Sequence, residues 1–125
     1  LLDTATLLWS YLQKSRLSAA ASKAILNETN EVFVSAESYW EIAIKLSIGK
    51  LSLADPITEF VRGAVEANGY TILHVSPEHA ERVALLHFHH KDPFDRILVA
   101  QALVEGMSLV SPDQALDVYG VNRIW

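Results

Sequence analysis

The sequence predicts a three-layer α/β fold, in which a mainly parallel sheet of five strands is covered by helices on both faces. Short apolar runs rich in β-branched residues alternate along the chain with longer segments of helical periodicity. Connections of this kind are right-handed and leave the strands parallel. No repeat or linker divides the sequence, so residues 1–125 are predicted to form a single domain.

The strands are predicted from short buried runs, which occur at Leu1 to Asp3, Val32 to Ser35, Tyr70 to Val75, Ser108 to Val110 and Val121 to Ile124. The helices are predicted from apolar residues at intervals of three and four. They cover Thr6 to Gln13, Ser18 to Glu28, Ser38 to Ile48, Pro56 to Asn68, Pro77 to Leu86, Pro93 to Glu105, and a short turn near Pro112 to Val118.

Residues that start and stop helices support these boundaries. Each proline follows a residue that can cap a helix, which predicts an N-cap and first helical residue at Asp55-Pro56, Ser76-Pro77, Asp92-Pro93 and Ser111-Pro112. Glycines fall where helical patterns end, and a left-handed residue after the helix is predicted at Gly49, Gly69, Gly106 and Gly120.

Composition narrows the functional classes. With no cysteine, the chain has no disulfide, no thiolate zinc site and no cysteine nucleophile, and a cytoplasmic location is expected. Charged residues interrupt every apolar run before the roughly 18 residues that a membrane span needs, which favours a soluble protein. The formal net charge of −5 repels a polyanion, so any binding of nucleic acid must be local or assisted by a metal.

Four acidic residues from separate segments are expected to meet at the carboxyl edge of the sheet, where open parallel sheets bind ligands. Asp3 ends the first strand, and Glu41 lies in the opening turns of the helix that follows the second. Asp113 follows the fourth strand, and Asp95 lies in the first turn of the helix capped by Asp92. Converging carboxylates repel one another unless a cation lies among them. Mg²⁺ and Mn²⁺ bind oxygen ligands and can promote the hydrolysis of a phosphodiester by water. Cleavage of RNA is therefore the leading hypothesis.

Each acid also has an ordinary structural explanation. Asp3 can cap a helix, Asp95 can complement a helix dipole, and Asp113 can occupy a first turn. Glu41 and Lys45 have the spacing of a helical ion pair. Spacing alone leaves these alternatives open. The apolar neighbours Trp40 and Ile44 favour partial burial of Glu41, and a buried acid needs a partner, either Lys45 or a metal.

Four sequence blocks resemble the VapC-type PIN-domain toxins, and the resemblance extends from Leu1 to Trp125. The blocks are Leu1-Leu2-Asp3-Thr4 with Leu7-Leu8-Trp9, the segment from Ser35 to Lys45, the segment from Asp92 to Ala102, and Leu109-Val110-Ser111-Pro112-Asp113. The resemblance implies a PIN-like fold and Mg²⁺- or Mn²⁺-dependent cleavage of RNA by an activated water.

The family's acidic quartet corresponds to Asp3, Glu41, Asp95 and Asp113. Asp3 and Asp95 are expected to bind the metal directly, and Glu41 and Asp113 directly or through water. Asp92 is a further candidate ligand, although it also serves as an N-cap. Thr4 resembles a residue that contacts metal-bound water in the family, but Ala5 stands where many relatives carry His, which puts the substrate contacts in doubt.

Several cations are candidates for contact with RNA phosphate, namely Lys45, Lys50, Arg96 and Lys91 with the neighbouring histidines His87, His89 and His90. An ordinary solvated loop is the favoured interpretation of the histidines, because they lack the spacing of a zinc motif. The aromatic residues on helical patterns, Trp9, Tyr11, Trp40 and Phe60, are expected in the core or an interface rather than on RNA bases.

The resemblance further implies a homodimer and a cognate antitoxin, whose apolar segment lies in a groove beside the active site. DNA binding then depends on the antitoxin.

Two alternative functions remain open for the chain. One is a phosphatase or receiver domain, but Ala5 stands where the haloacid-type motif needs a second Asp, and the central strand ends at Ser76 rather than at a phospho-accepting Asp. The other is a PIN-fold binding module without catalytic activity, against which the intact quartet argues.

Overall fold

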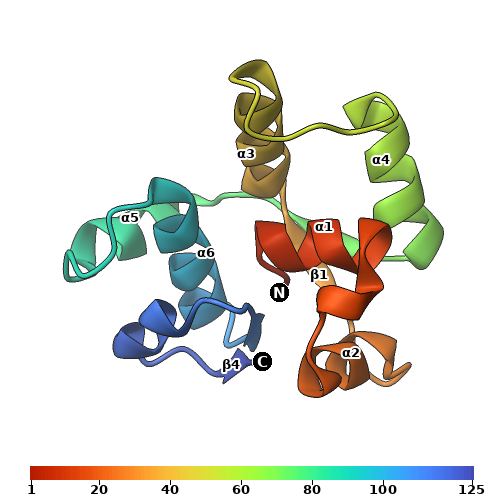
Figure 1. Cartoon of the computed structure of the whole chain (residues 1–125). Coiled ribbons are helices and arrows are strands. Elements are labelled where there is room, and N and C mark those ends of the chain that lie inside the picture. Colours follow the sequence, from red (N-terminus) through yellow and green to blue (C-terminus); the bar gives the residue numbers. More distant parts are fainter.

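The computed structural model describes residues 1–125 as short parallel strands that alternate with helices (Figure 1). The α-helices are α1 (Thr4–Leu12), α2 (Ala19–Leu26), α3 (Ala36–Ser47), α4 (Ile57–Ala64), α5 (Pro77–Leu85) and α6 (Pro93–Val104). The strands are β1 (Phe33–Ser35), β2 (Thr71–Leu73), β3 (Leu109–Val110) and β4 (Arg123–Ile124). Three 3₁₀ helices complete the chain, η1 (Lys14–Arg16), η2 (Glu66–Asn68) and η3 (Gln114–Tyr119). The α/β class predicted from the sequence is confirmed.

The strands form two parallel pairs and not the single five-stranded sheet that the sequence predicts. β1 pairs with β2, and β3 pairs with β4. The predicted first strand contributes only Leu2, which makes isolated parallel bridges to Val34 and to Val110 and so lies between the two pairs. This segment is too short to form a ladder because Asp3 already caps α1, which begins at the next residue.

Neighbouring residues of the strands pack into two different apolar clusters. Leu2 and Val110 belong to the larger cluster, whereas Leu1 and Leu109 belong to the smaller one, as expected when side chains alternate between the faces of extended chain. Helices α1 to α4 fill the larger cluster with Leu7, Ala21, Ile42 and Phe60, and α6 and η3 fill the smaller one with Leu98, Val99, Ala102 and Leu116. The strands are therefore packed against helices on both faces.

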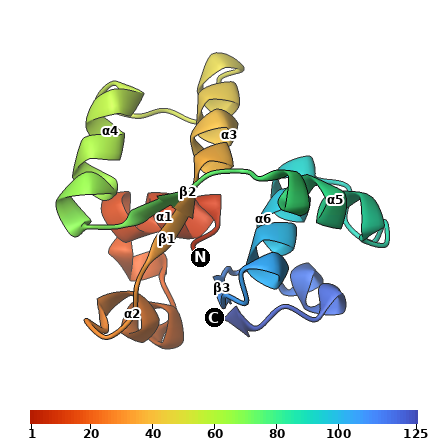
Figure 2. The ribbon, with the colours of Figure 1, turned by 180° about the vertical axis from the view of Figure 1, so that it is seen from behind.

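The two views of the ribbon agree with this arrangement. In Figure 1, α1 lies in front of β1, and in Figure 2, seen from behind, β1 and β2 lie in front of α1. Helices α5 and α6 pack against each other on the other side of the molecule from α4. None of the helices combines the length and the apolar composition of a membrane span.

Half of the predicted proline caps are confirmed. Ser76 and Asp92 cap α5 and α6 through their side chains. The prediction for Asp55 is wrong, because α4 begins one residue later with Pro56 itself at the N-cap position. The prediction for Ser111 is also wrong, because η3 is capped by Asp113 and the Ser111 side chain is free for another role. All four glycines predicted after helices have positive φ.

Candidate metal centre

The four predicted acids lie where the carboxyl ends of the strands meet. Asp3 follows Leu2, Asp113 follows β3, Glu41 lies in α3, which begins where β1 ends, and Asp95 is the third residue of α6. Three of them are close enough to act on one another electrostatically, since the charge of Glu41 raises the pKa of both Asp3 and Asp95. Asp113 is connected to Asp3 through hydrogen bonds to Ser111. The structure thus brings together acids that are up to 110 residues apart in the sequence.

Asp3 is the most buried of these acids, with 5% of its surface exposed. Its Oδ1 accepts a hydrogen bond of 2.6 Å from the Thr6 backbone N–H, which makes it the N-cap of α1. Its Oδ2 accepts a hydrogen bond of 2.6 Å from the Ser111 hydroxyl. Burial raises the pKa of Asp3, and these two hydrogen bonds oppose the rise. No Lys or Arg pairs with this carboxylate.

Ser111 connects Asp3 with Asp113. This fully buried hydroxyl donates to Asp3 and accepts a hydrogen bond of 3.1 Å from the Asp113 backbone N–H. Asp113 in turn caps η3, because its Oδ1 accepts a hydrogen bond from the Ala115 N–H. Its Oδ2 takes no part in the cap. This role of Ser111 was not predicted, because a Ser-Pro pair is typical of a helix N-cap. Its position directly after a strand, at the binding edge, was the available signal.

Asp95 is a half-buried carboxylate without a Lys or Arg partner. Removal from water raises its pKa from 3.8 to about 6, and Asp92, Glu41 and Asp3 add to the rise while His90 opposes it. Burial and neighbouring negative charges both penalise the ionised form of this carboxylate, so a cation that enters the cluster stabilises it. Asp95 therefore has both the position and the electrostatic environment expected of a direct metal ligand.

Glu41 is buried with 7% exposure, as the sequence analysis expected. Its partner is Lys45 one turn later on α3, so the predicted helical ion pair is present. Trp40 does not cause this burial, since it is 62% exposed on the surface. The Lys45 side chain is 43% exposed, so its ammonium group borders both the acids and the solvent.

The remaining candidates differ in their accessibility. The Thr4 hydroxyl is buried and donates to Ser38 at 3.1 Å. Asp92 is exposed and caps α6 by accepting from the Phe94 N–H at 2.9 Å, so its structural role is confirmed. Phe60 is buried in the core as expected, at 3% exposure.

Arg96 is buried, and its guanidinium binds other groups of the protein. It is 7% exposed, and its guanidinium donates to the carbonyl oxygens of Val83, Leu86 and His87 at 2.9–3.1 Å. It also donates to the Tyr119 hydroxyl at 3.3 Å. A guanidinium group can donate to several acceptors at once. Here its hydrogen bonds hold the C-terminal end of α5 and the loop that follows. These contacts argue against the predicted contact of Arg96 with RNA.

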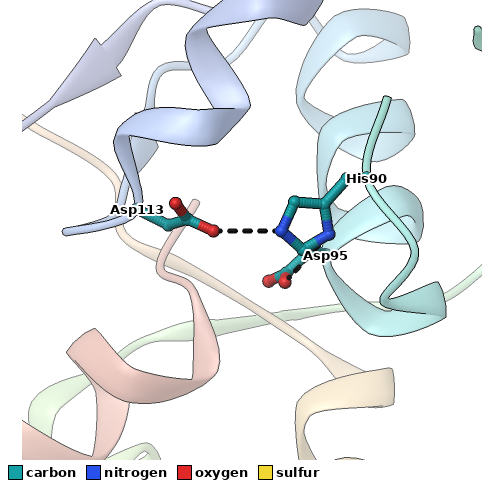
Figure 3. A group of neighbouring side chains, drawn as sticks. All are labelled: His90, Asp95 and Asp113. Atoms are coloured by element: carbon teal, nitrogen blue, oxygen red, sulfur yellow. Dashed lines mark hydrogen bonds and ion pairs between the residues drawn. The ribbon is translucent and has the colours of Figure 1, made fainter. Parts of the chain in front are cut away.

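His90 lies among the acids, which the sequence analysis did not anticipate. Figure 3 shows its imidazole ring between Asp95 and Asp113, and the three side chains offer ligand atoms within 4.8 Å of one another. Nε2 is 3.2 Å from Asp113 Oδ2, and Nδ1 is 3.5 Å from Asp95 Oδ2. By contrast, His87 and His89 are exposed and contact each other, as expected of a solvated loop.

The chemistry of this donor set fits a divalent cation. Asp3 and Asp95 are carboxylates without a Lys or Arg partner, held in a region where burial penalises their charge. Carboxylate oxygens are the preferred ligands of Mg²⁺ and Mn²⁺, and a few of them suffice because these ions keep several waters. The cluster thus has the composition of a metal centre.

Comparisons with known proteins identify the family of this chain. The sequence matches the PIN domain profile over residues 1–122. It is also 33% identical over 116 residues to Ribonuclease VapC22 of Mycobacterium tuberculosis (strain ATCC 25618 / H37Rv), a match that covers 93% of this chain and 88% of that protein. The resemblance to VapC-type proteins is confirmed, and the chain belongs to the PIN-domain family.

Proposed function

We propose that this chain is a Mg²⁺- or Mn²⁺-dependent endoribonuclease that acts as the toxin of a type II toxin–antitoxin pair. The observation that carries this proposal is the convergence of Asp3, Glu41, Asp95 and Asp113 with only Glu41 paired to a Lys or Arg. The name of the relative VapC22, a ribonuclease, supports RNA as the substrate. The three-layer PIN-like arrangement is part of the proposal, and the two apolar clusters on either face of the strands support it.

In this proposal Asp3 and Asp95 bind the metal directly, whereas Glu41 and Asp113 bind directly or through water. When bound, the dication polarises the scissile phosphate and helps to activate a water. Asp3 is positioned before any ion arrives, because Thr6 and Ser111 fix both of its oxygens. Such preorganisation lowers the cost of assembling the site.

Lys45 is the cation best placed to meet RNA phosphate. It borders the acids through its ion pair with Glu41, and nearly half of its side chain faces solvent. An ammonium group here offsets part of the local negative charge, which otherwise repels the substrate. Thr4 is buried and bound to Ser38, so we propose for it a positioning role in the wall of the site.

We propose that the cognate antitoxin covers the surface beside α3, and that the toxin is a homodimer. A groove runs along α3, the helix that carries Glu41, and is lined by Ala36, Glu37, Tyr39, Trp40, Ala43 and Ile57. This mainly apolar surface suits an apolar segment of a partner. The net charge of −5 supports the proposal that any contact with DNA is made by the antitoxin.

The proposed function is tested by cleavage of a fluorescently labelled single-stranded RNA that contains a structured loop. We expect cleavage in Mg²⁺ or Mn²⁺, complete loss in excess chelator, and recovery when either ion is restored. The reason is that the carboxylates alone repel the phosphodiester and supply no activated water. Cleavage that continues at full rate in chelator would rule out the metal mechanism.

A further inference from the structure

The loop between α5 and α6 exposes an aromatic ring. This loop runs from Leu86 to Asp92, and Phe88 near its middle is 73% exposed. No other Phe, Tyr or Trp of the chain is exposed to this extent. A single exposed apolar side chain is common in proteins, so exposure alone assigns no role to Phe88. Its surroundings supply the further evidence.

The Phe88 ring is held in place by a cation. The guanidinium carbon of Arg96 lies over the ring at 4.9 Å from its centroid, which is within the range of a cation–π contact. Arg96 is itself buried and fixed by its hydrogen bonds to backbone carbonyl groups. The guanidinium thus covers one face of the ring, and the rest of the ring is open to solvent. A ring that is already positioned loses little freedom when a ligand packs on it.

The same loop is anchored beside the acids. The His90 backbone N–H donates to the Tyr119 hydroxyl at 2.7 Å, and the His90 ring lies between Asp95 and Asp113 (Figure 3). Phe88 and His90 are two residues apart, so their Cα atoms are separated by at most about 7 Å. A strand of RNA whose phosphate is held at the acids therefore passes within reach of the Phe88 ring.

The geometry points to a substrate contact: we propose that an unpaired base of the RNA, next to the cleaved phosphodiester, stacks on Phe88. Unpaired bases stack on aromatic side chains, and this contact tolerates any base because every base has a flat π face. The inference rests on the proposed function and deepens it, since it assigns the substrate class as RNA with unpaired bases at the cleavage site. A base within a duplex stays stacked on its own neighbours and cannot reach the ring.

The charges around Phe88 favour RNA over a protein as the ligand of this surface. The segment from His87 to Lys91 contains no acidic residue, and Lys91 is exposed and takes part in no ion pair. Lys91 is therefore free to meet a phosphate of the same strand. The alternative is an apolar protein interface, which would also include Leu85 at the end of α5, because Leu85 is 70% exposed.

The test compares steady-state cleavage of a labelled single-stranded RNA in Mg²⁺ by the wild type and three variants. Phe88→Leu keeps an apolar side chain without a ring and is expected to raise KM about 5-fold or more, the size of one lost base contact, with little change in kcat. Phe88→Tyr keeps the ring and is expected to match the wild type. Leu85→Ala, the matched control on the same surface, is also expected to match it.

Substrates that lack one base give a second readout that needs no variant. Once the cleaved bond is mapped, single abasic nucleotides are placed at successive positions around it. We expect one position to raise KM of the wild type by the same factor as Phe88→Leu. The same abasic RNA is expected to impair Phe88→Leu little further, because both changes remove one contact.

Three results would overturn the inference alone and leave metal-dependent cleavage intact. They are an unchanged KM in Phe88→Leu, a wild type that is indifferent to every abasic position, or equal additional losses in Phe88→Leu on every abasic RNA. Altered oligomeric states of Phe88→Leu and Leu85→Ala with normal cleavage would show that the surface is a protein interface. Failure of the wild type to cleave RNA would overturn the proposed function, and this inference with it.

Discussion

Replacement of Asp3 by Asn is expected to reduce RNA cleavage by about 100-fold or more, since even outer partners of metal sites contribute about 10–100-fold. Asp3 is the buried acid that we assign as a direct ligand, and it has no Lys or Arg partner that could take over its role. An amide is a much poorer ligand for Mg²⁺ than a carboxylate. The measurement is the initial rate of cleavage at saturating Mg²⁺.

The same substitution is expected to leave the fold intact. Asn is as good an N-cap as Asp, so the hydrogen bond from the Thr6 N–H to Oδ1 is retained. Burial raises the pKa of the Asp3 carboxyl group, so its ionised form is destabilised in the folded state. The neutral amide of Asn avoids this cost. Asp55→Asn, at an exposed position before α4, is the matched control and is expected to cleave like the wild type. A well-folded Asp3→Asn variant with normal activity would disprove the assignment.

The metal-free protein is expected to lose stability as the pH rises from about 4 to about 6. Burial raises the pKa of Asp95 from 3.8 to about 6, whereas in the unfolded chain this group titrates near its ordinary value. In that interval the folded state binds more protons than the unfolded state, so the free energy of unfolding falls with increasing pH and stays low above it. Asp3 acts in the same direction, because burial raises its pKa too.

Thermal melts in chelator between pH 4.5 and 7.5 check this prediction. Asp95→Asn is expected to show a weaker pH dependence than the wild type and a higher Tm above pH 6. Saturating Mg²⁺ is expected to stabilise the wild type by roughly 2.7 kcal/mol at 100 times the Kd, and the variant much less. A wild type that gains stability relative to Asp95→Asn as the pH rises would show that the Asp95 carboxylate is not destabilised by burial.

The sequence predicts the order of elements well and the strands poorly. Helix boundaries carry local signals, and residues such as Ser76 and Asp92 cap their helices as predicted. Strand pairing depends on distant partners and leaves little local signature. Leu1 to Asp3 reads as a strand, yet only Leu2 pairs, because the cap formed by Asp3 ends the extended segment at once.

The residues of the site, too, were predicted where their signal is local and missed where their role depends on distant contacts. The acids are found from the sequence because they stand just after buried runs, and a sheet edge gathers such residues. His90 and Ser111 were misjudged because their roles depend on contacts across 23 and 108 residues. Arg96 was misassigned because a positive charge beside an acidic motif gives no sign that its guanidinium is buried against three carbonyl groups.

Whether the four acids hold a metal ion is decided by the position of a bound ion. Crystals grown with Mn²⁺ locate the ion by its anomalous scattering, independently of any assay. We expect a strong peak bonded to carboxylate oxygens of Asp3 and Asp95, with Glu41 and Asp113 around it. A peak on some other part of the surface, with the four acids paired only to protein groups, would contradict it.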